Sequence, residues 1–369
     1  MSHTDPRRAY IHMKARDILK DLVAINTIAD KNNHEIMDYI EDFYNKIGVA
    51  VERRTNPENG KEVLIASYGE DPAIGFMGHT DTVDITDGWV TDPFVLTDKG
   101  DGNLYGLGSC DMKGGMACWM TAIANTDLKS LKRGFKCYHT YDEEIMFGGI
   151  HDLVGSGEKF PDHVIVAEPT DMVPSIGSKG LIEIIFTFRG VTTHSSTPID
   201  GKNSNKNAVR FLNKMLDFEL SLREHRTEFF AIPYSTMNIG ILNGGNAINK
   251  VPAETTIYLD FRIADSKYEY PKIRAFIDEA IAEFDASYEI INDIPSFISE
   301  SDLVKVYEEK TGKKGEPFSG ITEGSFYEGD KIIIGPGPMT MHQKNECVSI
   351  KQLEQTQKLY EEMIEMLCK

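Results

Sequence analysis

Apolar positions along the chain recur with two periods, one typical of helices and one typical of strands. The helical period marks two amphipathic segments near the N-terminus, at 9–25 and 34–49, and a buried helix is expected at 111–126. Short apolar runs typical of buried strands lie around them, at 62–69, 73–79, 134–142 and 162–169. Strands that alternate with helices in this way predict an α/β domain with a largely parallel sheet.

The order of predicted elements changes between residues 181 and 291. Strand, helix, two strands, helix and strand are expected there, at 181–190, 205–220, 235–242, 254–263, 270–284 and 287–291. This β-α-β-β-α-β order is the ferredoxin-like arrangement. A helix, a strand and a closing helix follow, at 301–312, 331–337 and 351–367. We therefore predict one domain made of 1–180 and 294–369, with a second domain, 181–293, inserted into it.

Composition and charge narrow the possible functions. With 369 residues, 41% of them hydrophobic, the chain can bury a full core. A formal net charge of −19 without clustered Lys or Arg argues against a nucleic-acid partner. No apolar run is long enough for a membrane helix, and no apolar segment typical of a signal peptide follows Arg7 and Arg8. The five cysteines are odd in number and lack CxxC spacing, so we expect a reducing, cytoplasmic location.

Candidate metal ligands lie in five short segments rich in Gly, Thr or Pro. These segments read GHTDTVD, GLGSCDMKGG, YDEEIMFGG, VAEPTD and GPGPMTMHQKNE, and they contain His79, Asp111, Glu143, Glu144, Glu168 and His342. None of them falls within the ferredoxin-like region, which is why we interpret that region as an insertion. Three of these residues, His79, Glu144 and Glu168, follow predicted strands, where open α/β sheets place their ligands. Together the segments could supply a site for two metal ions.

Each segment also has a simpler structural interpretation. In GHTDTV, a period of two places His79 and Asp81 on one side, so Asp81 could accept a hydrogen bond from the imidazole nitrogen that faces away from a metal. A lone HxD triplet is more often a coincidence on the surface. Asp111 precedes a predicted helix; it is suited to bridging two ions, although an isolated Asp in that position is usually an N-cap.

The adjacent pair Glu143 and Glu144 suggests two different roles. On the extended segment that we expect, neighbouring side chains point in opposite directions, so one carboxylate could bind metal while the other handles protons. The alternative is a solvated acidic strand end. Glu168 follows the apolar run VIVA and precedes Pro169, and His342 follows the turn IIIGPGP; taken alone, neither would be remarkable.

The charges of the candidate ligands favour two divalent ions over one. Asp111, Glu144 and Glu168 carry three negative charges, the two histidines carry none, and a bridging hydroxide would balance the remaining positive charge of two ions. Imidazole and carboxylate ligands without thiolates favour Zn²⁺, with Co²⁺ or Mn²⁺ as workable substitutes.

Taken together, the five ordered segments resemble those of the co-catalytic di-zinc metallopeptidase and deacylase family, which includes acetylornithine deacetylase, succinyl-diaminopimelate desuccinylase and carboxypeptidase G. The resemblance extends over nearly the whole chain and implies a zinc-exopeptidase-like catalytic domain with an inserted lid and dimerisation domain. It implies one metal bound by His79, Asp111 and Glu168, and a second bound by Asp111, Glu144 and His342. Glu143 would be the general base, and Asp81 would orient His79.

The resemblance also assigns roles within the inserted domain. His194, in GVTTHSSTP, is similar to a family histidine that reaches the active site of the neighbouring subunit and steadies the oxyanion, which implies a homodimer. Asn249 and Arg262 resemble residues near the carboxylate of the substrate, which Arg could bind in a bidentate manner. A surface ion pair is an equally good interpretation of Arg262. The TE pair at Thr322 and Glu323, and Glu rather than Asp at 168, favour deacylases modestly.

These observations predict a cytoplasmic, dimeric di-zinc hydrolase that cleaves the amide bond of an N-acyl amino acid. A dipeptidase or carboxypeptidase with the same metal centre is the nearest alternative. GLGSCDMKGG could instead suggest a dinucleotide-binding loop, but Asp111 takes the place of the third glycine in GxGxxG. A non-catalytic binding module is the third possibility, and the complete ligand set with Glu143 argues against it.

Overall fold

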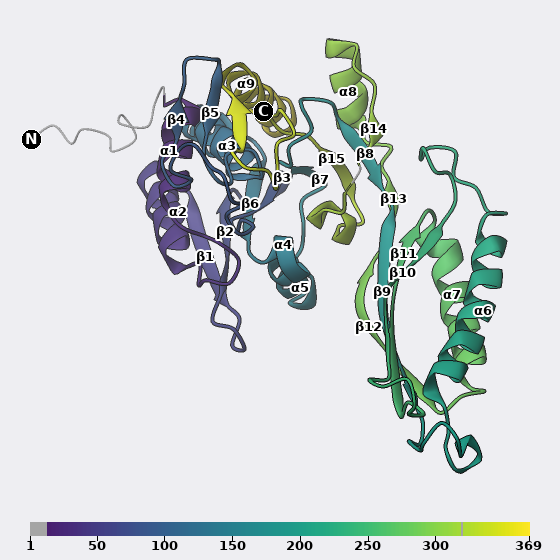
Figure 1. Cartoon of the computed structure of the whole chain (residues 1–369). Coiled ribbons are helices and arrows are strands. Elements are labelled where there is room, and N and C mark those ends of the chain that lie inside the picture. The colour runs from purple at the N-terminus through teal and green to yellow at the C-terminus, as the bar shows by residue number, and fades with distance from the viewer. Residues whose placement is uncertain (1–12, 319) are drawn as a thin grey trace, which may run out of the picture. The chain divides into compact units, whose positions relative to one another are not determined.

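The computed structural model describes residues 13–318 and 320–369, which form two compact units (Figure 1). The first contains the described residues up to Ile176, together with Ser299–Glu316 and Thr322–Lys369. The second contains Gly177–Ile298 and Pro317–Ile321. The junctions lie a few residues from those expected at 180 and 293, and the short segment 317–321 joins the inserted unit. Residues 9–12 of the first predicted helix lie outside the described residues.

A mixed sheet forms the centre of the first unit. Its main strands are β1 (Ala50–Thr55), β2 (Glu62–Tyr68), β3 (Pro72–His79), β6 (Gly134–Thr140), β7 (His163–Val166) and β15 (Asp330–Ile333). They follow the order β1-β2-β6-β3-β7-β15, continued by β8 (Ser175–Ser178). Strands β6, β3, β7 and β15 run parallel, whereas β1, β2 and β8 pair antiparallel with their neighbours. The predicted α/β fold is confirmed, with the parallel strands in the middle of the sheet.

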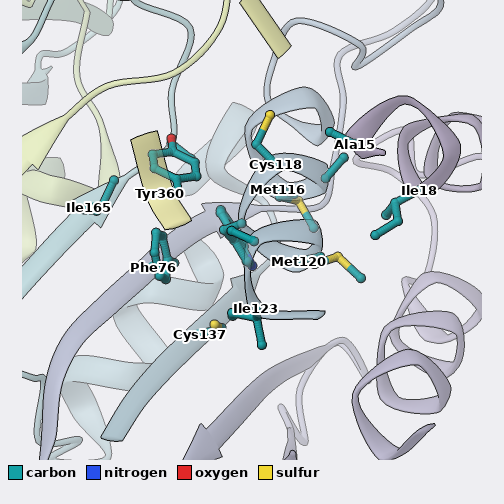
Figure 2. Packing of buried hydrophobic residues seen from close by; sticks show 14 of the residues in the cluster. Ala15, Ile18, Phe76, Met116, Cys118, Met120, Ile123, Cys137, Ile165 and Tyr360 are labelled. Atoms are coloured by element: carbon teal, nitrogen blue, oxygen red, sulfur yellow. The ribbon is translucent and has the colours of Figure 1, made fainter. Parts of the chain in front are cut away.

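Four helices build the main hydrophobic core of this unit, namely α1 (Ala15–Ala24), α2 (His34–Ile47), α3 (Lys113–Asn125) and α9 (Ile350–Cys368). Twelve of the thirteen residues of α3 are buried, because α1, α9 and β3 all pack against it. The ring of Phe76 on β3 lies 6.0 Å from that of Trp119. It lies 5.2 Å from the ring of Tyr360 (Figure 2). This packing anchors the segment that carries Asp111, just before α3.

Shorter elements complete the first unit. The helices are α4 (Glu143–Met146), α5 (Gly148–Gly155), α8 (Asp302–Thr311) and the 3₁₀ turns η2 (Leu128–Ser130) and η4 (Glu323–Phe326). A small antiparallel sheet has the order β16-β5-β4, from β16 (Cys347–Ser349), β5 (Asn103–Tyr105) and β4 (Thr97–Asp98). It joins the chain after His342 to the chain before Asp111, which are far apart in sequence.

The second unit has the predicted ferredoxin-like order. Its elements are β9 (Gly180–Arg189), α6 (Ser204–Leu222), β10 (Thr236–Gly244), β11 (Glu254–Ile263), α7 (Ser266–Ile281) and β12 (Ala286–Ile294). Shorter elements are η3 (Pro198–Asp200) and β13 (Phe297–Ile298), and β14 (Glu316–Pro317) spans the boundary between the two units in sequence. The sheet is antiparallel, with the order β10-β11-β9-β12, and both helices pack against it (Figure 1).

Two further properties bear on the environment of the protein. All five cysteines are free and buried within the described residues. In the same part of the chain, no helix has the length and apolar character needed to cross a bilayer.

Candidate metal centre

Three neighbouring parallel strands bring the central ligands together. His79 is the last residue of β3, Glu143 and Glu144 follow β6, and Glu168 lies two residues beyond β7. Because β6, β3 and β7 are parallel neighbours, their carboxyl ends meet at one edge of the sheet. The location expected for these residues from the sequence is therefore observed.

Asp111 approaches the same edge from the start of α3. A Cβ atom built on Gly115, in the first turn of α3, would lie 2.1 Å from the carbonyl oxygen of Ala167. Only glycine allows the helix to pack this closely against the chain next to Glu168. The close approach brings Asp111 to the strand ends.

The carboxylate of Asp111 lies between two groups of potential ligands. Its Oδ1 is 3.1 Å from Nε2 of His79, and its Oδ2 is 3.8 Å from Nε2 of His342. Nε2 of His79 lies 4.0 Å from Oε1 of Glu168, and Nε2 of His342 lies 2.8 Å from Oε2 of Glu144. Ligand atoms fall within 4.8 Å of one another in His79-Asp111-Glu168 and in Asp111-Glu144-His342. The structure thus assembles both predicted ligand sets around one shared carboxylate.

Asp81 contacts His79 differently from the sequence expectation. Nδ1 of His79 lies 3.0 Å from the backbone carbonyl oxygen of Asp81, while the nearer carboxylate oxygen is 3.5 Å away. Because a carbonyl oxygen only accepts hydrogen bonds, this contact requires the proton on Nδ1 and leaves the Nε2 lone pair for a metal. The tautomer is the one expected, but the backbone of Asp81 selects it.

The Asp81 carboxylate instead anchors the two glutamates. Its oxygens accept hydrogen bonds from the backbone N–H groups of Glu143 and Glu144, at 3.3 and 3.2 Å. Those groups open the short helix α4, where backbone donors lack partners within the helix. Asp81 therefore positions α4 and the side chains on it.

The expectation that Glu143 and Glu144 lie on an extended segment is wrong. Strand β6 ends at Thr140, Asp142 adopts a left-handed conformation with φ 55°, and both glutamates lie in α4. An ion pair with Lys61 fixes Asp142 at this turn. The two carboxylates still separate, since Oε2 of Glu143 lies 4.0 Å from Nε2 of His79 and that of Glu144 contacts His342.

The electrostatics of the cluster suit divalent cations. Burial, with repulsion from neighbouring carboxylates, raises the pKa of Glu143 and Glu168 well above the ordinary range and raises that of Glu144. Oε1 of Glu168 is buried and has no hydrogen-bond partner in the described part of the chain. Bound cations would satisfy this oxygen and keep the crowded carboxylates ionised. An oxygen- and imidazole-rich donor set of this kind fits zinc or a similar ion.

The other predicted site residues belong to the second unit. His194 and Asn249 are both exposed and close to each other, since the backbone N–H of Ser195 donates to the carbonyl oxygen of Asn249 at 3.0 Å. Arg262 forms a two-pronged ion pair with Asp260, with N–O distances of 3.0 and 2.9 Å. The surface ion pair considered for Arg262 is therefore observed, and its role in binding substrate stays a prediction.

Of two buried glutamates near the centre, Glu346 was not singled out from the sequence, and Glu323 was considered only as part of the TE pair. Glu323 on η4 is fully buried, and neither of its oxygens has a hydrogen-bond partner among the described residues. Burial raises its pKa to about 7. Glu346 accepts hydrogen bonds from the loop that carries Asp111. Glu323 lies in the segment ITEGSF and Glu346 ends the segment GPGPMTMHQKNE, but a sequence alone does not show that a glutamate is buried.

Comparison with known proteins identifies the family of this chain. Residues 75–366 match the family described as peptidase family M20/M25/M40. Acetylornithine deacetylase from Photorhabdus laumondii is 29% identical over 374 residues, covering 95% of this chain and 97% of that protein. Acetylornithine deacetylase from Proteus mirabilis is also 29% identical, covering 95% and 96%.

Solved structures share the fold at lower identity. A tripeptidase from Staphylococcus aureus superposes with a TM-score of 0.73 at 21% identity, over 94% of this chain and 96% of that one. An M20 family metallo-carboxypeptidase from Sulfolobus solfataricus gives 0.76 at 16% identity, over 96% and 99%. A dinuclear metal-binding peptidase of the M20 family from Bacillus subtilis gives 0.69 at 14%, over 98% and 99%. With its family match over most of its length, the chain belongs to peptidase family M20/M25/M40 and is a metal-dependent hydrolase.

Proposed function

We propose that this chain hydrolyses the amide bond of an N-acyl amino acid with two zinc ions. The observation that carries the proposal is the carboxylate of Asp111, whose two oxygens face His79 on one side and His342 on the other. His79, Asp111 and Glu168 would hold one ion, and Asp111, Glu144 and His342 the other. Bound there, the ions supply Lewis-acid activation of water and of the acyl carbonyl group.

Glu143 is the residue that we assign to proton transfer. It is not needed in either ligand set, yet its Oε2 lies 4.0 Å from Nε2 of His79, at the centre of the site. Burial raises the pKa of the Glu143 carboxyl group well above its ordinary value, so the carboxylate accepts a proton more readily than an exposed one. Glu143 would accept the proton of the attacking water and deliver it to the departing amine nitrogen.

The curated relatives favour an acyl amino acid as the substrate. Two of them are named acetylornithine deacetylase and match almost the full length of this chain. The solved neighbours include a tripeptidase and a carboxypeptidase, which keep a peptide substrate as the alternative.

A substrate panel separates these two functions. We expect kcat/KM on N-acetyl and N-succinyl amino acids to exceed that on dipeptides, measured by release of the free amino acid from zinc-loaded protein. Higher kcat/KM on dipeptides would instead establish the dipeptidase alternative. Absence of hydrolysis of both N-acyl amino acids and dipeptides would contradict the proposal.

Homodimerisation through the second unit is part of the same proposal. Exposed apolar residues lie along one side of α6, at Val209, Leu216 and Leu220, and β10, at the edge of its sheet, exposes Ile241 and Leu242. Such surfaces are typical of protein interfaces. In the dimer, His194 would act on the partner's active site, and Asn249 and Arg262 would bind the substrate carboxylate. Buried free cysteines support a reducing, cytoplasmic location.

Mixed dimers test the role of His194. A dimer with Glu143→Ala in one subunit and His194→Ala in the other has one intact site only if His194 acts across the interface. We then expect about half of the wild-type kcat, because one of two symmetric sites is complete. If His194 acts within its own subunit, neither site is complete and kcat should stay near the level of the single variants.

A further inference from the structure

Glu346 makes three hydrogen bonds to the backbone of the loop that ends at Asp111. Its Oε1 accepts from the N–H groups of Cys110 and Asp111, at 2.8 and 2.9 Å, and its Oε2 accepts from the N–H of Gly108 at 2.9 Å. Only 2% of Glu346 is exposed. Hydrogen bonds to a buried carboxylate are stronger than those between neutral groups. The side chain of Glu346 therefore holds the backbone of the loop that ends at Asp111.

The same residue belongs to the loop that carries His342. Glu346 lies four residues beyond His342, and its own carbonyl oxygen accepts from the N–H of Gly106 at 3.1 Å. The hydroxyl group of Thr340 closes this loop, since it donates to the carbonyl oxygen of Cys347 at 2.9 Å and accepts from its N–H at 3.0 Å. The position of His342 and that of Asp111 are thus tied together through Glu346.

Packing alone does not require a carboxylate at this position. Glu346 is buried beside a second negative charge, that of Asp111, and such a charge is costly unless its hydrogen bonds are made. A carboxylate offers acceptors on both oxygens, whereas an amide offers only one acceptor and adds a donor. The three backbone donors are therefore matched by a side chain with two acceptor oxygens.

We propose that Glu346 is a positioning residue that fixes Asp111 relative to His342 and so couples the two metal sites. It belongs to neither ligand set; it acts through the 108–111 loop. This inference rests on the proposed function, because it assumes that Asp111 is shared by two ions. It predicts that a change at Glu346 weakens binding at both sites together.

Glu346→Gln is the direct test. Its NH₂ group would face either the N–H of Gly108 or those of Cys110 and Asp111, so at least one hydrogen bond is replaced by a repulsive contact. In metal-free protein we expect faster hydrogen exchange at these three amides. We expect zinc affinity, measured by competition with a chelator, to fall about 10- to 100-fold for both ions, as for other residues that support metal ligands.

Glu269→Gln is the matched control. Glu269 is also fully buried, lies in the second unit, and accepts hydrogen bonds from the side chain of Ser235 and, at 3.0 Å, from the N–H of Asp265. This variant loses a buried carboxylate charge without touching the metal loop, so zinc affinity should stay at the wild-type value. Glu346→Asp keeps both acceptor oxygens and should recover part of the zinc affinity that Glu346→Gln loses. If Glu346→Gln fails to fold, zinc affinity is measured on Glu346→Asp instead.

Two results would overturn the inference. The first is that the wild-type protein binds two ions and that Glu346→Gln and Glu346→Asp bind both ions with the wild-type affinity. The other is fast exchange of the amides of Gly108, Cys110 and Asp111 in the wild-type protein. Failure of the wild-type protein to bind two ions would be a different outcome, since it would remove the proposed function itself.

Discussion

Replacing Glu143 by glutamine is expected to lower kcat by roughly 10²–10⁴-fold, the usual contribution of a positioned general base. Glutamine keeps the size of the side chain and the short helix α4, but it cannot accept and return a proton. Because Glu143 lies outside both ligand sets, the zinc content should stay at the wild-type value. Steady-state kinetics on the best N-acyl amino acid, with elemental analysis of the same sample, measure both effects.

Glu323→Gln is a suitable control for the loss of a buried carboxylate near the site. Neither oxygen of Glu323 has a hydrogen-bond partner among the described residues, so this variant should change kcat much less. A Glu143→Gln enzyme with wild-type kcat would show that another group transfers the proton. Loss of zinc in that variant would show that Glu143 is a ligand.

Replacing Asp111 by alanine is expected to abolish measurable activity and to remove both ions. Its Oδ1 faces His79 and its Oδ2 faces His342, so one substitution removes a ligand from each set. Zinc per subunit, measured after dialysis against metal-free buffer, should fall well below the wild-type value.

Asp101→Ala provides a control in the same part of the chain. Asp101 is exposed, accepts a hydrogen bond from the hydroxyl of Tyr105 at 2.7 Å, and belongs to neither ligand set. Its loss should leave zinc content and activity unchanged. Retention of one tightly bound, active zinc in Asp111→Ala would mean that Asp111 serves a single ion.

Much of the fold was predictable because the hydrophobic pattern matches the burial. The apolar run that ends at His79 forms β3, which pairs with a parallel strand on each side. The region from Leu181 to Ile291 folds in the predicted β-α-β-β-α-β order. Strand β1, by contrast, was not predicted. Its sequence AVERRT is mostly polar because it lies at the edge of the sheet, with alternate side chains exposed.

Details of the site depended on backbone geometry that the sequence does not show. Asp142 turns the chain out of the strand and places Glu143 and Glu144 on a helix, where an extended segment was expected. The contacts of Asp81 and Glu346 with backbone N–H groups depend on residues more than 60 positions away. Short-range patterns identified which residues carry the chemistry, whereas the contacts that hold them required the folded structure.

The number of metal ions tests the central claim most directly. Elemental analysis of wild-type protein purified without chelator is expected to give about two zinc ions per subunit, as a site with one bridging carboxylate and two ligand sets requires. Two ions would agree with the placement of Asp111 between His79 and His342. Absence of any bound transition metal, in protein that nevertheless hydrolyses N-acyl amino acids, would contradict the account.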